Sequence, residues 1–312
     1  MHWLNFVRAL AAHLSTQKYD VKIIEMPLWM ITIEYVGKKS VETDFIFIPH
    51  KMKQNWNLDN RVFYYMQMAV PHIFSIDNEG WCASASHWPI SIDKQSINDN
   101  VIKIFNERIS SNKSKFTQSL TKIKLPPKYV FFPCQLPHDE TIKFHSDISV
   151  EQALEALILW LINFPSDIKL VIKSHPANLK AMDSLKQILK QYLPNYPFLK
   201  SMIIWLDGGN IHELISNSIA IFTVNSGVGL EAMAHCKMVY TFGNADYYAA
   251  SKKIMFGGSL NNAAEAINYE INQLKVANND YIAVNDKKML TAWYNTHFDT
   301  KDLSTFKKFK IV

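Results

Sequence analysis

Residues 219–242 read IAIFTVNSGVGLEAMAHCKMVYTF, and this stretch decides the fold. An apolar run of strand length, Ile219 to Val224, leads into Asn225-Ser226-Gly227-Val228-Gly229. A helix-forming stretch then runs from Gly229 to His235, and a second apolar run spans Met238 to Phe242. Strand, helix and strand in this order form a right-handed crossover between parallel strands. The stretch therefore predicts one βαβ unit with a polar turn after its first strand.

The same alternation extends toward the N-terminus. We predict strands at Tyr129 to Phe132, Ile168 to Ile172 and Met202 to Leu206, and helices at Val150 to Asn163, Leu179 to Tyr192 and Ile211 to Ser216. Alternating strands and helices are typical of a doubly wound parallel sheet with helices on both faces. Ligands bind such sheets beyond the carboxyl ends of the strands, where this sequence concentrates polar and glycine residues.

The first 108 residues predict a smaller, abbreviated α/β domain. Its strand candidates are 21–24, 30–35 and 45–48, and its helix candidates are 4–14 and 61–68. The polar stretch 109–124, followed by Pro126-Pro127, has the composition of a linker. We therefore expect an N-terminal α/β domain at 1–125, a doubly wound Rossmann-like domain at 126–290 and a helical tail at 291–312 that packs back on the N-terminal domain.

Composition bounds the classes of function. A chain of 312 residues, 48% hydrophobic and 20% charged, is typical of a globular protein with about two domains. The longest strongly apolar stretch, Ala156 to Ile162, is too short to span a membrane, and no signal peptide is evident, so we expect a cytoplasmic location. The net charge of +5 mildly favours anionic partners. Nucleic-acid binding is not predicted, because the sequence has no basic stripe with interleaved aromatic residues.

The turn after Val224 has several interpretations. Gly227-x-Gly229-x-x-Ala232 formally matches a dinucleotide fingerprint, but the next strand ends at Gly243 without the acidic residue that would hold a ribose. A phosphate cradle fits better, with Ser226 as a donor at a helix N-terminus. Asn225 and Ser226 acting only as helix caps fit the stretch at least as well.

Two further loops carry candidate chemistry. Ser174-His175-Pro176 ends a strand, and an imidazole there can donate to a departing phosphate, while Lys173 adds charge or faces solvent. In the loop after Phe132, Asp139 or Glu140 could act as nucleophile or base. His138, His145 and Asp147 fit no familiar metal-ligand spacing, and no Asp-x-Asp occurs, so we expect no metal.

Taken together, four segments resemble the capsule polysaccharide biosynthesis proteins related to bacterial β-Kdo transferases. They are Phe131 to Gln135 with Asp139, Val171 to Pro176, Thr223 to Ala232, and Gly243 with Tyr247. The resemblance covers about residues 128–250. It implies that 126–290 is the nucleotide-sugar-binding domain and that 1–125 is the acceptor side. It implies an α/β, GT-B-like fold of two Rossmann-like domains and retaining, metal-independent transfer of Kdo or a related sugar acid from a CMP-activated donor, in capsule or lipopolysaccharide biosynthesis.

The resemblance also implies roles for individual residues. Asp139 would be the nucleophile of a double displacement, and His175 and Ser226 would bind the CMP phosphate. Glu231 would lie close to the nucleotide and Gln135 would shape the donor pocket. The predicted site residues are Asp139 and His175 as catalytic groups, and Gln135, Lys173, Pro176, Asn225, Ser226, Gly227, Gly229 and Glu231 as donor-binding groups.

The expected partners are a nucleotide-sugar donor, which is a substrate and not a cofactor, and a glycan or glycolipid acceptor, with peripheral contact at the inner membrane as an option. Two departures from the family pattern bear on donor affinity: Gly227 stands where a second Ser or Thr is common, and His235-Cys236 replaces a small-residue pair. Two alternatives stay open. One is a UDP-sugar-dependent transferase or epimerase of GT-B-like fold, and the other is a catalytically inactive nucleotide-sugar-binding scaffold subunit.

Overall fold

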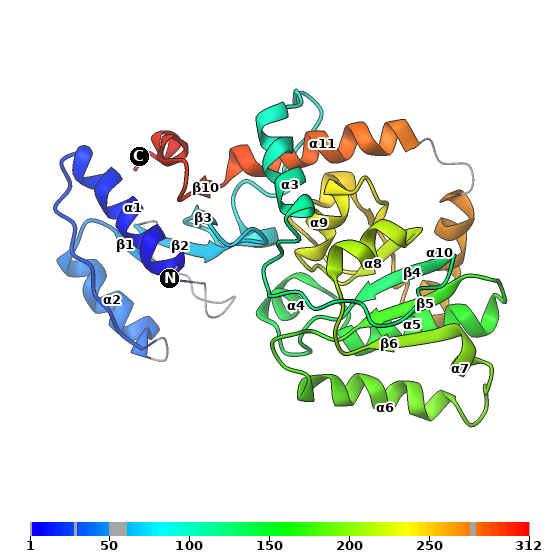
Figure 1. The fold of residues 1–312 in the computed structure, drawn as a ribbon. Coiled ribbons are helices and arrows are strands. Elements are labelled where there is room, and N and C mark those ends of the chain that lie inside the picture. The colour runs from blue at the N-terminus through cyan, green and yellow to red at the C-terminus, as the bar shows by residue number, and fades with distance from the viewer. Residues whose placement is uncertain (1, 28–29, 50–60, 275–278, 312) are drawn as a thin grey trace. The chain divides into compact units, whose positions relative to one another are not determined.

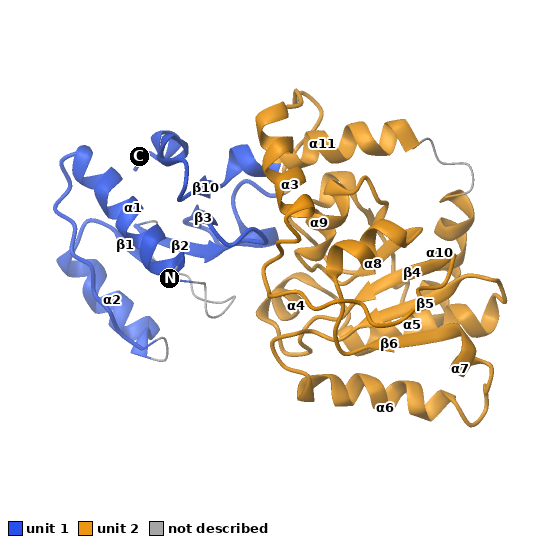
Figure 2. Ribbon diagram, viewed as in Figure 1, with its two compact units in different colours: residues 1–88, 293–312 blue, residues 89–292 orange. Residues whose placement is uncertain are grey.

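The computed structural model describes residues 2–27, 30–49, 61–274 and 279–311. The chain divides into unit 1, residues 1–88 and 293–312, and unit 2, residues 89–292 (Figure 2). This division differs from the predicted boundaries after residues 125 and 290. Unit 2 begins earlier because helix α3 (Asp99–Ser110) packs on helix α9 (Val228–Ala234), which follows the decisive turn.

Unit 2 is built on a six-stranded sheet whose paired neighbours are all parallel (Figure 1). Its spatial order is β6-β5-β4-β7-β8-β9. In chain order this is the 3-2-1-4-5-6 arrangement of Rossmann folds. The strands are β4 (Tyr129–Pro133), β5 (Lys169–Lys173), β6 (Ile203–Leu206), β7 (Ala220–Thr223), β8 (Val239–Thr241) and β9 (Lys252–Lys253).

Helices cover both faces of this sheet, as the sequence predicts for a doubly wound domain (Figure 1). Helices α5, α6, α7 and α10 pack together on one face, while α8 and α9 pack on the other face against β4, β7 and β8. Besides α3 and α9, the helices are α4 (Glu140–His145), α5 (Val150–Asn163), α6 (Asp183–Tyr192), α7 (Leu199–Met202), α8 (Ile211–Asn217), α10 (Leu260–Gln273) and α11 (Asn279–Thr296), whose last four residues belong to unit 1.

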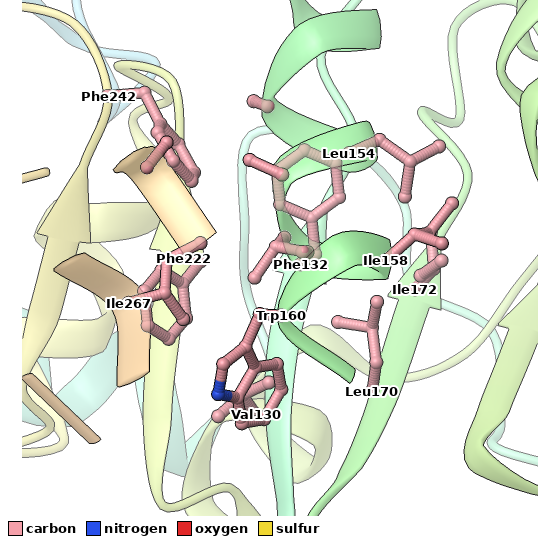
Figure 3. Close-up of a cluster of buried hydrophobic side chains, with 14 of the residues drawn as sticks. Val130, Phe132, Leu154, Ile158, Trp160, Leu170, Ile172, Phe222, Phe242 and Ile267 are labelled. Atoms are coloured by element: carbon pink, nitrogen blue, oxygen red, sulfur yellow. The ribbon is translucent and has the colours of Figure 1, made fainter. Parts of the chain in front are cut away.

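The main core lies between the sheet and α5. Figure 3 shows Phe132, Ile172 and Phe222 from three neighbouring strands beside Ile158 of α5 and Ile267 of α10. Helix α5 begins where the sequence predicts, because Ser149 and Gln152 form a reciprocal capping box before the apolar run. This core fixes the strand ends from which the polar loops emerge.

Unit 1 is the abbreviated α/β unit. Its sheet order is β1-β2-β3-β10, with β1 parallel to β2 and both other pairs antiparallel, so the doubly wound parallel sheet expected for this half is instead mixed. Its elements are α1 (His2–Thr16), α2 (Ile33–Glu42), β1 (Ile46–Pro49), β2 (Val62–Gln67), β3 (Ile73–Asp77) and β10 (Phe298–Asp299), with a 3-10 helix at Leu303–Lys308. The α/β class is confirmed, with one Rossmann-like unit and one abbreviated unit.

Several predictions for the first half are wrong. Residues 61–68 were expected to be helical, but Val62–Gln67 is a strand whose side chains Val62 and Tyr64 are buried alternately. Residues 30–35 were expected to be a strand, but α2 begins at Ile33 because the Thr32 hydroxyl accepts a hydrogen bond from Tyr35 N. Residues 21–24 have no regular structure. The tail does contribute to unit 1, since Phe306 and Phe309 share a core cluster with Phe6.

Candidate functional site

The predicted site residues lie at the carboxyl ends of three adjacent strands of unit 2. The sheet order β5-β4-β7 places the loop of Gln135 and Asp139 between the loops of His175 and Ser226. Two strand spacings separate β5 from β7, or about 10 Å. The topology therefore gathers these three loops along one edge of the sheet.

Gln135 and Asn225 form a buried brace between β4 and β7. Gln135 Oε1 accepts hydrogen bonds from Asn225 N at 2.9 Å and from Thr223 Oγ1 at 3.2 Å, while Gln135 Nε2 donates to Asn225 Oδ1 at 2.9 Å. Asn225 Nδ2 donates in turn to the Thr141 carbonyl at 2.9 Å. Both amides are buried, so the structure gives these two predicted donor-binding residues a role in holding the loops together.

The turn from Ser226 to Gly229 is held by local hydrogen bonds and by Tyr247. Ser226 Oγ accepts from Val228 N at 3.2 Å, but the N-cap of α9 is Gly227, which has no side-chain cap hydrogen bond. The Ser226 carbonyl accepts from Gly229 N at 2.9 Å and from the Tyr247 hydroxyl. Gly227 is exposed at φ −57°, a conformation open to any residue. The Ser226 hydroxyl hydrogen has no acceptor within the described ranges, so it can donate to a ligand.

His175 has a defined tautomer. Its Nδ1 accepts a hydrogen bond from Ala177 N at 3.2 Å. Burial lowers the pKa of the imidazole; the charge of Asp139 opposes this shift, and Lys173 and Lys115 add to it. A neutral imidazole that accepts at Nδ1 carries its proton on Nε2. His175 is thus a neutral N–H donor at the strand terminus, suited to an anionic oxygen.

Asp139 is the N-cap of α4. Its Oδ1 accepts from Thr141 N at 2.9 Å and from the Thr141 hydroxyl, so one carboxylate oxygen is fixed. Within the described part of the chain, Oδ2 has no hydrogen bond. Pro176, also predicted for donor binding, is exposed in the loop that begins with Ser174. Ser174 Oγ donates to Asp207 Oδ1 at 2.7 Å, which ties this loop to the end of β6.

Lys173, at the end of β5, and Glu231, in α9, are two buried residues of opposite charge type. Burial lowers the pKa of the Lys173 ammonium, and the charge of Glu231 opposes this shift. Burial also raises the pKa of the Glu231 carboxyl to about 7, opposed by the Ser114 hydrogen bond and by the charges of Arg108 and Lys173. Ser114 Oγ donates to Glu231 Oε2 at 3.1 Å, and Arg108 Nη2 lies 3.6 Å from Glu231 Oε1. Glu231 is therefore held by α3 and by the chain that follows it.

The stretch predicted as a linker is the part of the site that sequence reasoning missed. We call residues 113–121 the edge segment. Three of its side chains accept hydrogen bonds from consecutive backbone N–H groups at the end of β6, at 2.8 to 3.1 Å: Gly209 N to Ser119, Asn210 N to Thr121 and Ile211 N to Gln118. The prediction of a linker from composition is wrong here. The Ser, Thr and Gln side chains that suggested a linker accept hydrogen bonds from the loop after β6 and so fix the segment to unit 2.

The other end of the edge segment is anchored through two histidines. His212 Nε2 donates to the Lys113 carbonyl at 3.1 Å, so His212 Nδ1 accepts from His235 Nε2 at 3.0 Å. Between the two anchored ends, the ring of Phe116 lies against the His175 ring with centroids 5.1 Å apart. A phenylalanine in a Ser- and Lys-rich stretch was a signal in the sequence that this segment packs against another part of the chain.

Among the described residues, no group of three or more His, Cys, Asp and Glu side chains is placed to hold a metal ion. His145, considered with His138 and Asp147, is buried. No described helix has the length and apolar character needed to cross a membrane.

Comparisons with known proteins place these features in a family. The capsule polysaccharide biosynthesis protein family matches residues 83–251, just over half of the chain. The capsule polysaccharide modification protein LipB of Neisseria meningitidis is 25% identical over 122 residues, 38% of this chain and 29% of that protein. Protein FixF of Sinorhizobium fredii is 31% identical over 147 residues, 44% of this chain and 31% of that protein. The chain thus aligns with less than a third of the length of these relatives.

Solved structures give weaker similarities. A β-Kdo 2,7 transferase, KpsC of Thermosulfurimonas dismutans, matches with a TM-score of 0.47 and 15% identity, covering 78% of this chain and 88% of that one. HepE of Anabaena in complex with UDP matches with a TM-score of 0.45 and 12% identity, covering 87% and 64%. The family match spans the edge segment and every predicted site residue, which confirms the resemblance read from the motifs. This chain belongs to the capsule polysaccharide biosynthesis protein family.

Proposed function

We propose that this protein is a retaining glycosyltransferase that transfers Kdo or a related sugar acid from a CMP-activated donor to a glycan or glycolipid acceptor in surface polysaccharide assembly. The proposal rests on the group of hydrogen-bond donors at the carboxyl ends of β5, β4 and β7, which suits an anionic ligand. There the neutral His175 donor and the Ser226 hydroxyl flank the Asp139 loop, with Lys173 behind them. Family membership supplies the biosynthetic context.

In the proposed reaction, Asp139 Oδ2 attacks the anomeric carbon as the bond to the CMP phosphate oxygen breaks. The leaving phosphate accepts hydrogen bonds from His175 Nε2 and from the Ser226 hydroxyl. An acceptor hydroxyl then attacks the same carbon, the bond to Asp139 Oδ2 breaks and releases the carboxylate, and the hydroxyl proton passes to solvent water. Two inversions give net retention. The hydrogen bonds from Thr141 to Oδ1 favour this role, because they fix the carboxylate and leave Oδ2 for attack.

The identity of the nucleobase tests the proposal first. Calorimetry of the purified protein with CMP, UDP and NAD is expected to show selective CMP binding. His175→Ala and Ser226→Ala should each weaken CMP binding roughly tenfold, since each removes a hydrogen bond to a charged group. Preference for UDP would instead support the UDP-sugar transferase or epimerase, and absence of any nucleotide binding would contradict the proposal.

Asp139→Asn separates an enzyme from an inactive scaffold. Asparagine is nearly isosteric and is itself a good N-cap, so α4 and CMP binding are expected to survive. Transfer from the CMP-activated donor should fall by about a thousandfold or more, because the amide cannot form the glycosyl ester. Glu140→Gln, at the next residue and the first of α4, serves as the matched control. Equal activity of Asp139→Asn and wild type would exclude Asp139 as the nucleophile.

A further inference from the structure

Phe116 is the aromatic side chain of a mostly polar segment, and it lies against a predicted site residue, His175. Its ring and the His175 imidazole are inclined by 78° with centroids 5.1 Å apart. Phe116 is 39% exposed, so most of its surface is covered despite the polar sequence around it. The contact with His175 covers part of the Phe116 ring, so we ask what this contact does for His175.

The backbone on both sides of Phe116 is fixed to unit 2. On the N-terminal side, the Lys113 carbonyl accepts from His212 and Ser114 donates to Glu231. On the C-terminal side, Gln118, Ser119 and Thr121 hold the N–H groups of residues 209–211. Five hydrogen bonds over nine residues restrain the edge segment, so Phe116 is presented to His175 by an anchored loop and not by a loose tether.

His175 in turn needs restraint from outside its own loop. Its backbone N–H donates to Met182 Sδ at 3.4 Å, and its Nδ1 accepts from Ala177 N, so these contacts fix the tautomer and one edge of the ring. Neither contact covers a face of the ring. The Phe116 ring adds an aromatic contact from outside the His175 loop.

We propose that Phe116 is a positioning residue that holds the His175 imidazole in place to donate its Nε2 proton to the phosphate of the donor. The inference rests on the proposed function, because it takes a phosphate as the acceptor of that hydrogen bond. It assigns the edge segment to the donor site: one end holds Glu231 through Ser114, and the middle holds His175 through Phe116. Direct stacking of Phe116 on the nucleobase is the alternative role.

A double-mutant cycle on CMP affinity distinguishes these roles. Phe116→Ala is expected to weaken CMP binding about five- to tenfold in the wild type and to have little further effect in His175→Ala, because Phe116 acts through His175. Phe116→Tyr should restore binding. If Phe116→Ala weakens binding equally in both backgrounds, Phe116 contacts the ligand itself and the proposal fails. Phe198→Ala, a 44% exposed phenylalanine before α7, controls for loss of surface aromatic area.

A second measurement needs no ligand. Burial is the main cause of the lowered pKa of His175, so Phe116→Ala should raise this pKa toward its ordinary value in an NMR titration, with the His175 signal assigned from His175→Asn. Asp139, Lys173 and Lys115 are the charged groups that act on this imidazole, and all three are unchanged in the variant. An unchanged pKa overturns the positioning role, even if CMP binds. If the pKa of His175 rises in Phe116→Ala but the wild-type protein does not bind CMP, the contact between Phe116 and His175 is supported and the proposed function is rejected.

Discussion

Gly229→Ala is expected to destabilise the protein by about 3 kcal/mol, because a methyl group at this position overlaps a buried tyrosine. A Cβ on Gly229 would lie 2.2 Å from the Tyr247 hydroxyl oxygen and 2.3 Å from its Cζ. Tyr247 is 2% exposed and its hydroxyl donates to the Ser226 carbonyl, so the ring cannot move aside without losing that hydrogen bond. Urea unfolding of the variant and the wild type measures the difference.

Two variants make this result specific. Gly227→Ala lies two residues away at an exposed position with φ −57°, and it should leave the free energy of unfolding nearly unchanged. Combining Gly229→Ala with Tyr247→Ala should cost less than the sum of the two single changes, since the smaller side chain removes the overlap. A Gly229→Ala protein as stable as the wild type would mean that the turn does not depend on Tyr247.

This result bears on how the decisive turn was interpreted. From the sequence, Gly229 was a candidate for close approach to a phosphate. In the structure, the requirement for glycine comes from Tyr247, which lies in the loop after β8 and contacts the turn from outside it. The sequence shows which position lacks a side chain, but the neighbour that fills the space is set by the packing of distant loops.

Elements of unit 2 were predictable because their signals are local. The α5 helix has a capping box before a long apolar run, and β4, β5 and β7 are buried strands bounded by polar turns. The strand order was not predicted, since it depends on pairing between distant segments. In unit 1, residues 62–66 form a continuous apolar run, and periodicity alone does not tell a helix from a strand in such a short run.

In the candidate site, too, features with a local sequence signal were predictable, and contacts between distant segments were not. Motifs identified the loops of Asp139, His175 and Ser226, and the sheet order brings these loops to one edge. The contacts of Glu231 with Arg108 and Ser114 were not predictable, because they join two helices and a polar segment far apart in the sequence. Composition alone cannot show whether serine and threonine hydroxyls face water or accept hydrogen bonds from another loop.

Gln135→Met is expected to lower the free energy of unfolding by about 3 kcal/mol or more, because it leaves three buried polar groups without their partner. Methionine keeps nearly the same volume, but Asn225 N, Asn225 Oδ1 and Thr223 Oγ1 each lose a hydrogen bond to the glutamine amide. Gln152→Met is a matched control. The Gln152 side chain accepts one hydrogen bond, from Ser149 N, so about 1 kcal/mol is expected there.

Gln135→Met also tests whether Gln135 supports the Ser226 turn or binds the donor directly. Asn225 N donates to Gln135 and Ser226 N donates to Thr223 Oγ1, so the backbone before Ser226 depends on the brace. CMP affinity of Gln135→Met should therefore fall together with the thermal stability. The loss should be smaller when Ser226 is already alanine, because both changes act on the Ser226 hydrogen bond. If CMP affinity falls while the free energy of unfolding stays at the wild-type value, Gln135 binds the donor directly and the brace is not its main role.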